Sequence, residues 1–264
     1  MRSADHSLAD YRRAELRRAP YRMALYAGIA GIVMIAGCQL LFPRMPQQVI
    51  DFLRVAFHLS DLGGVVLFND YAAVYFCALF VGLLGLLDVV VVPREEHQLE
   101  LLLSKPVPAA DFLAARTWPV LAMTTLVGVT LAGACAAATL PYLGPHSSIS
   151  ASGALGAGLA MTAIVLVQLT ALSIIFVRLV ESMNAMLLAL LVALVPMLPS
   201  AVFLYRPDLF AGRPALTAVT VLANLVWYDA TMAWLGPVML LAALLCALVG
   251  VRAGGRLLQR SGRV

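Results

Sequence analysis

The sequence predicts an all-α integral membrane protein with six transmembrane helices, and three observations carry this prediction. Apolar residues make up 62% of the chain and charged residues only 12%, about half the charged share of a typical soluble domain. Six runs are long enough for a helix to cross a hydrocarbon core about 30 Å thick. Apolar residues are continuous within these runs rather than alternating, which indicates helices and not barrel strands.

The distribution of basic residues predicts how these helices are oriented. The predicted spans are residues 21–42, 71–92, 117–140, 154–177, 183–205 and 233–251. Of the 18 basic residues, 14 precede the first span, follow the last, or lie between spans two and three or four and five. The other four are Arg44, Arg54, Arg206 and Arg213. The positive-inside rule therefore places both termini in the cytoplasm, which agrees with an even number of spans.

Three regions are predicted along the chain. Residues 1–20 contain a moderately amphipathic, arginine-rich segment that suits a cytoplasmic interfacial helix; a solvated basic tail is the alternative. Residues 21–253 form the six-helix transmembrane domain, and residues 254–264 form a cytoplasmic basic tail. We expect membrane lipid to surround the whole of the middle region.

The connections on the outer side carry their own signals. The loop over residues 43–70 is mildly amphipathic and suits a short surface helix. Pro196 and Pro199 remove helix hydrogen bonds and should kink or end span five. Residues 206–232 are apolar but interrupted by prolines and acids, which predicts a re-entrant segment before the sixth helix, with aromatic residues at the interface.

Motifs for enzyme chemistry are missing from the sequence. There is no phosphate-binding loop, and Lys105, the only lysine, precedes a proline instead of following glycines. The four cysteines each fall inside a span without a CxxC partner, and the histidines are scattered, so no metal or redox motif is indicated. The basic residues act as topology determinants rather than as a nucleic-acid-binding face. We therefore expect neither an enzyme nor a cofactor in this chain.

One acidic residue, Asp88, lies near the cytoplasmic end of span two, five residues before Pro93. A charge at this depth is costly unless it faces water or a partner. Two interpretations stand side by side. Asp88 lines a polar vestibule, or it is an interfacial acid that pairs with a basic loop residue.

The charged loop between spans two and three, residues 93–116, is the most informative stretch. Pro93 suits the first turn of a helix, and Glu95 and Glu96 suit its positive N-terminal end. A leucine stripe follows, and Pro106 with its neighbouring proline stops the helix. The pattern predicts a short amphipathic cytoplasmic helix that a partner can push. An ordinary interfacial hairpin without a partner is the alternative.

This loop resembles the corresponding loop of ABC-2-type transporter permeases, which carry acidic and basic residues, Gly-Thr, Leu-Glu-x-Leu-Leu-Ser-x-Pro-Val and then a basic residue. The matching residues are Glu95, Leu99, Glu100, Leu102, Leu103, Ser104, Pro106, Val107 and Arg116. The sequence departs at His97 and Gln98, where the family has Gly-Thr. The resemblance covers about a tenth of the chain.

The resemblance implies a function and a set of partners. It implies a permease subunit in the bacterial cytoplasmic membrane that pairs with a second permease copy and is driven by separate cytoplasmic ATPases, which bind ATP and magnesium. Export is the usual direction in this family. The expected ATPase-coupling residues are Glu95, Glu96, Leu99, Glu100, Leu102, Leu103, Lys105, Pro106 and Arg116.

Two other classes of function are open at this point. A six-span enzyme acting on lipid would need acids or histidines clustered at one membrane depth. A membrane scaffold or sensor without transport would have no ATPase partner.

Overall fold

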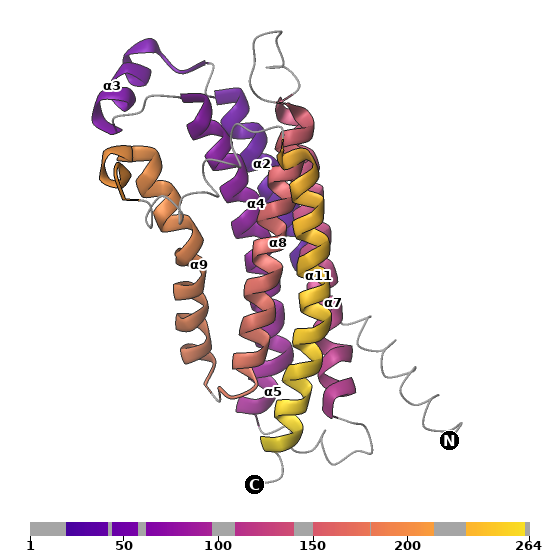
Figure 1. Ribbon diagram of the computed structural model, residues 1–264. Coiled ribbons are helices and arrows are strands. Elements are labelled where there is room, and N and C mark those ends of the chain that lie inside the picture. The colour runs from indigo at the N-terminus through magenta and orange to yellow at the C-terminus, as the bar shows by residue number, and fades with distance from the viewer. Residues whose placement is uncertain are drawn as a thin grey trace.

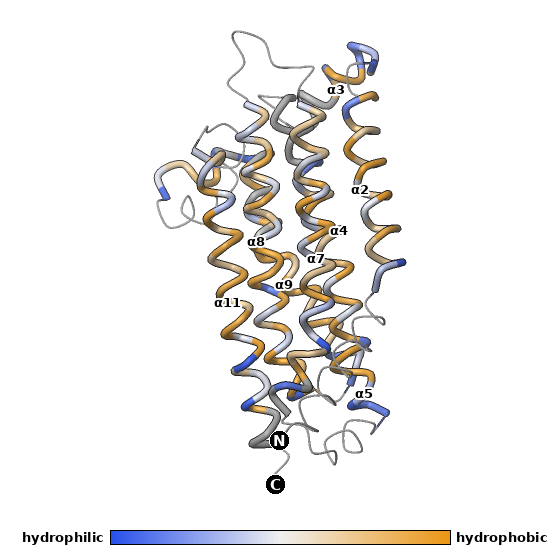
Figure 2. The backbone as a smooth tube through the Cα atoms, turned by 90° about the vertical axis from the view of Figure 1, so that its right-hand side faces the viewer, coloured by the Kyte–Doolittle hydropathy of each residue, from blue (hydrophilic) through white to orange (hydrophobic). Residues whose placement is uncertain are grey.

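The described part of the chain is entirely helical. The computed structural model describes residues 20–41, 44–57, 62–96, 109–139, 150–179, 181–213 and 231–261, and these contain no strand. Six of the helices are long and apolar enough to cross a membrane. The apolar part of the bundle occupies its middle, and hydrophilic residues gather toward its two ends (Figure 2). The predicted all-helical class and the number of candidate spans are confirmed.

The helices follow the predicted spans, with longer ends. Their bounds are α2 (Tyr21–Leu41), α3 (Gln47–Phe57), α4 (Leu62–Leu86), the π-helix η2 (Leu87–Val91), α5 (Val92–Glu95), α7 (Ala109–Thr139), α8 (Ala151–Phe176), α9 (Ser182–Tyr205), the 3-10 helix η4 (Pro207–Phe210) and α11 (Met232–Ser261). The expected short helix of the outer loop is α3, whose position relative to the bundle is visible in Figure 1. The predicted spans miss the polar end of α11 and a largely apolar stretch at the start of α4, residues 62–70.

Three boundaries differ from the prediction. The second span starts within α4, which begins at Leu62 rather than at residue 71. The residues predicted as a basic tail continue α11 as far as Ser261. Helix α7 begins at Ala109 rather than at residue 117. Helix α9 ends at Tyr205, as predicted, and neither Pro196 nor Pro199 ends it. The expected N-terminal helix and most of the expected re-entrant segment lie outside the described residues.

Antiparallel neighbours build one side of the bundle. Between α2 and α4, Gln39 Nε2 donates a hydrogen bond to Asp70 Oδ2 at 2.8 Å. Between α4 and α7, the thiol of Cys135 donates to the backbone oxygen of Asp70, and Arg116 donates to the backbone oxygen of Val89. From the first pair to the second, the residue number rises along one helix by as much as it falls along the other. The two helices therefore run in opposite directions over their shared length.

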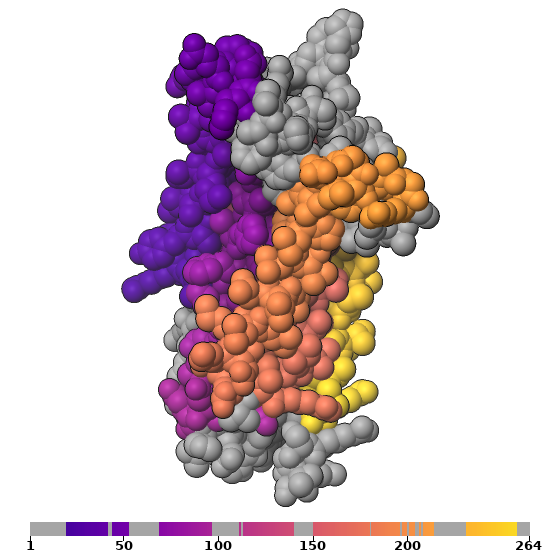
Figure 3. All heavy atoms as spheres, turned by 90° about the vertical axis from the view of Figure 1, so that its left-hand side faces the viewer, coloured from indigo at the N-terminus to yellow at the C-terminus, as the bar shows by residue number. Residues whose placement is uncertain are grey.

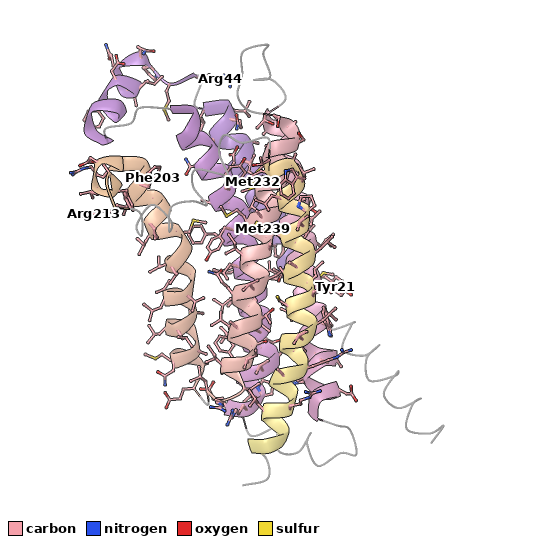
Figure 4. All side chains as sticks on the ribbon, viewed as in Figure 1. Tyr21, Arg44, Phe203, Arg213, Met232 and Met239 are labelled. Carbon is pink, nitrogen blue, oxygen red and sulfur yellow. The ribbon has the colours of Figure 1, made fainter. Side chains whose placement is uncertain are left out.

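Helices α8 and α11 run parallel and make the most extensive contact between any two described elements. Gly236 approaches the backbone of Gly156 near one end of the pair, and Gly250 approaches the side chain of Thr170 further along. The two partners of each pair are separated by the same number of residues along the chain, so α8 and α11 keep one register along their contact. Small residues at such an interface let two backbones pack closely in lipid, where dispersion rather than the hydrophobic effect holds helices together. Figure 4 shows Met232, the first residue of α11, beside α8.

Helix α9 stands apart from the other five spans, and Figure 3 shows it lying along one face of the molecule. It contacts α4 and α8 only sparsely, and few of its residues are buried. Its far end, where Phe203 and Arg213 lie, is held by an edge contact of Phe203 with Phe210 at a centroid distance of 5.4 Å. The apolar side chains of α9 are therefore exposed over most of its surface.

A polar bridge ties α9 to the bundle at one level. Gln168 Nε2 on α8 donates to the backbone oxygen of Val192 at 3.1 Å. Four residues after Val192 stands Pro196, which has no N–H to offer that carbonyl. The Tyr75 hydroxyl on α4 lies 2.9 Å from Gln168 Oε1 and 2.8 Å from the backbone oxygen of Ala193. Its single proton serves one of these acceptors at a time.

The bridge explains why a proline is tolerated in the middle of α9. In lipid, every backbone polar group needs a partner inside the protein, and neighbouring side chains provide it where proline removes the helix bond. Gln168 is that partner for Val192. Together with Tyr75, it places the proline-containing part of α9 at one point on the bundle.

We expect Gln168→Leu to destabilise the protein by about 1 to 2 kcal/mol, because the Val192 carbonyl loses its partner inside the membrane. The Pro196→Ala change restores an N–H for that carbonyl, so the cost of Gln168→Leu should fall in a Pro196→Ala background. Thermal unfolding of the four proteins of this double-mutant cycle in detergent measures the coupling. Equal costs in both backgrounds would show that the proline is not the reason for the bond.

Candidate functional site

A half-open cavity of about 640 Å³ lies where the described parts of α4, η2, α5 and α7 meet the start of α2. We call it the α4–α7 cavity. Most of its walls are apolar, and three ionisable side chains, Asp88, Glu96 and Arg116, line it. The described part of the chain stops at Glu96 and resumes at Ala109. The cavity therefore lies at the end of the bundle where α5 ends and α7 begins.

The π-helix η2 contributes the acidic residue Asp88 to the polar side of this cavity. Such single-turn widenings insert a residue into a helix and occur frequently at functional sites. Asp88 lies within η2 and is exposed, whereas its neighbours Leu87 and Val90 are buried. The N–H of Val92 donates to the backbone oxygen of Leu87, which closes the widened turn. The local geometry thus directs one acid away from the core.

Arg116 connects the two helices that form the cavity. Its side chain is 9% exposed, and its Nη1 donates to the backbone oxygen of Val89 at 3.4 Å. Pro93, four residues after Val89, has no N–H for that carbonyl. Arg116 therefore serves α4 as Gln168 serves α9. In each case a polar side chain from another helix bonds a carbonyl that proline leaves unpaired.

The structure brings three of the predicted site residues together and separates a fourth. Asp88, Glu96 and Arg116 line one cavity, and Glu95 is exposed without lining it. This arrangement fits the vestibule interpretation of Asp88. The other predicted coupling residues, Leu99, Glu100, Leu102, Leu103, Lys105 and Pro106, lie outside the described residues.

The predicted position of the two acids within a helix needs correction. Helix α5 begins at Val92 with Pro93 in its first turn, as expected, but it continues the path of α4 and η2 without a break. Glu95 and Glu96 therefore stand at the C-terminal end of a long helical path, not at the N-terminal end of a new one. Bonding of the freed carbonyl by Arg116 removes the cost that would otherwise favour a new helix at Pro93.

A buried acid that the sequence interpretation missed lies at the opposite end of α4. Asp70 is fully buried. Its Oδ2 accepts the hydrogen bond from Gln39, and its Oδ1 has no hydrogen-bond partner among the described residues. Asp70 was assigned to the outer loop because span two was predicted to begin at residue 71. The sequence does carry one signal for this contact: Gln39 and Asp70 lie at the predicted outer ends of two consecutive spans.

Asp70 in α4 and Asp88 in η2 are far apart. Asp70 and Asp88 are 18 residues apart on one helical path, which corresponds to roughly 27 Å. Within the described ranges, no group of three or more histidine, cysteine or acidic side chains could hold a metal ion. The arrangement offers single polar groups at the two ends of a span rather than a reactive cluster.

Comparison with known proteins identifies no relative. No protein-family model matches the chain, no curated protein matches it, and no solved structure matches it.

Proposed function

We propose that this chain is the membrane permease subunit of an ABC-2-type transporter, driven by separate cytoplasmic ATPases that bind ATP and magnesium. One observation carries the proposal: the loop over residues 93–116 matches the pattern of that family at nine positions, from Glu95 to Arg116. Two copies of the chain, or one copy and a close paralogue, would form the translocation pathway. The expected location is the bacterial cytoplasmic membrane, and the expected direction is export.

The geometry around the loop supports this proposal. Residues 97–108 connect directly to two membrane-spanning helices, α4 through η2 and α5, and α7 through its first turn. A force that an ATPase applies to the loop would therefore act on both helices at once. The long Arg116–Val89 hydrogen bond and the widened turn of η2 lie at this junction. They are weaker connections than a regular helix provides.

This arrangement suggests how access would be switched. When the ATPases close on ATP, the loop moves, and α5 and the start of α7 change their separation. The α4–α7 cavity lies between them and would widen or narrow with that separation. Asp88, Glu96 and Arg116 keep the cavity hydrated because water is the most favourable partner for ionised groups near the interface.

An enzyme acting on lipid is the less favoured alternative. It would need ionisable groups gathered at one membrane depth, and Asp70 and Asp88 lie toward opposite ends of one span. A scaffold without transport differs from the proposal in having no ATPase partner, which the next experiment tests.

Substitutions in the leucine stripe test the coupling role of the loop. We expect Leu99→Asp and Leu102→Asp to reduce ATPase co-purification and ATP-dependent transport by about tenfold, whereas Glu100→Ala should have a smaller effect. Binding energy concentrates in a few buried apolar anchors, and losing one costs roughly 1 to 2 kcal/mol or more. The variants should still insert, because the loop is outside the predicted spans. Membrane abundance, co-purified ATPase and ATP hydrolysis are the measurements.

The matched control is Phe52→Asp on α3, an exposed phenylalanine that the predicted topology places on the opposite side of the membrane. This variant should retain the ATPase. Normal insertion, ATPase binding and transport in both loop variants would overturn the proposal. Hydrolysis of ATP by the chain purified without any ATPase would overturn it as well, because the sequence has no phosphate-binding loop.

A further inference from the structure

An apolar groove separates α9 from α4 in the half of α9 that precedes the polar bridge. It has a volume of about 430 Å³, within the range of ligand-binding pockets. Every lining residue is apolar, and the groove lies within the membrane-spanning parts of both helices. Residues that line it include Phe76, Phe80, Met183, Leu187, Leu190 and Ala193. We call it the α4–α9 groove.

The length of the groove matches one leaflet of a bilayer. It extends along α9 from Met183 to Ala193, about 15 Å at 1.5 Å per residue. One leaflet is half of a hydrocarbon core of about 30 Å. At the inner end, the backbone oxygen of Ala193 lies 2.8 Å from the Tyr75 hydroxyl. The polar bridge thus marks the end of the groove near the middle of the membrane.

The mouth of the groove, at the end farthest from the polar bridge, lies beside a charged turn. Helices α8 and α9 are joined by a short turn that contains Arg178 and Glu181, just before Met183. Arg178 is exposed and has no ion-pair partner among the described residues. Glu181 instead accepts a hydrogen bond from Asn184 Nδ2 at 2.8 Å. A guanidinium in this position suits a phosphate group, to which arginine donates two parallel hydrogen bonds.

We propose that the α4–α9 groove binds one phospholipid, with an acyl chain along α9 and the phosphate at Arg178. The apolar lining, the leaflet-long depth and the cation at the mouth correspond to the three parts of such a lipid. A second copy of the chain is the competing occupant, and crosslinking distinguishes it from lipid. This site does not depend on the proposed transport function.

Photocrosslinking tests the acyl-chain part of the site. The full chain is reconstituted in nanodiscs of phosphatidylglycerol with p-benzoylphenylalanine in place of Leu187 or, as the control, Leu191. These side chains are 55% and 63% exposed, but only Leu187 lines the groove. After extraction into detergent, extensive washing and illumination, we expect about tenfold more lipid adduct at position 187, which corresponds to 1.4 kcal/mol of retention.

Two substitutions test the fit and the headgroup. Leu190→Trp fills the groove and should lower retained phosphatidylglycerol severalfold in native mass spectrometry, whereas Leu191→Trp should not. Arg178→Gln should also lower the amount of retained phosphatidylglycerol, and Arg178→Lys should retain more of it than Arg178→Gln. Size-exclusion profiles and thermal unfolding that match the parent protein show that the variants are folded.

Either of two results would overturn the proposal. One is a lipid-adduct yield that falls equally at positions 187 and 191 after washing, which would mean that lipid contacts the groove no more tightly than the rest of the surface. The other is a protein–protein crosslink at position 187 instead of a lipid adduct, which would assign the groove to a second copy.

Discussion

The Gly156→Val variant should fail to accumulate as a folded membrane protein. A Cβ atom at this position would overlap the backbone oxygen of Met232 at the start of α11. A flexible side chain can move aside, but here the neighbour is backbone, so the whole of α11 would have to shift. Overpacking of this kind costs on the order of 3 kcal/mol or more. The same overlap arises at Gly236, whose added Cβ would meet the backbone of Gly156.

The control for this prediction is Gly133→Val on α7, where an added Cβ meets nothing within 4 Å. Membrane abundance and the monodisperse fraction on size-exclusion chromatography compare the two variants. Gly156→Ala should fall between Gly133→Val and Gly156→Val, because one methyl group already produces the overlap. A Gly156→Val protein as stable as Gly133→Val would contradict the parallel packing of α8 on α11.

The second large effect is expected at the buried acid of α4. We expect Gln39→Leu to destabilise the protein by about 3 kcal/mol, because it removes the hydrogen-bond donor that Asp70 has on α2 and leaves a buried carboxylate without one. Adding Asp70→Leu should remove most of this cost, since replacing a buried ionic group by an apolar one is often neutral or stabilising. Thermal unfolding of the single and double variants measures both effects.

Gln47→Leu on α3 is the matched control for this pair. Gln47 is exposed, and its side chain bonds Asp51 at 3.4 Å. The same substitution should therefore change stability by less than about 0.5 kcal/mol. The Gln39–Asp70 hydrogen bond does not stabilise the bundle if Gln39→Leu lowers stability as little as Gln47→Leu does. The same conclusion follows if adding Asp70→Leu lowers the stability of the Gln39→Leu protein further.

Apolar length predicted the number of helices and most of their membrane-depth parts. Helix α2 ends one residue before its predicted end, and α9 begins one residue before its predicted start. The prediction failed at helix ends: α4 begins at Leu62, in a largely apolar stretch, and α11 continues through polar residues to Ser261. Hydropathy reports how well a segment suits lipid, and it carries no information about how far a helix extends beyond the membrane.

The candidate site was only partly predictable for a related reason. Asp88 was identified by its charge near a span end and Arg116 by the family resemblance of the loop, and both line the same cavity. Asp70 was missed because its burial depends on α2 and α7, which pack around it. The widened turn of η2, which exposes Asp88, likewise has no signal in the apolar pattern.

The sequence by itself determined the class of the protein: its apolar runs require six lipid-compatible helices. Only the tertiary structure decided which helices meet. It paired α8 with α11 through Gly156 and Gly236 and assigned Gln168 to the carbonyl before Pro196. The physical reason is that lipid and leucine are equally apolar, so hydropathy cannot choose a neighbour. That choice depends on the fit of small residues and on the placement of individual hydrogen-bond donors.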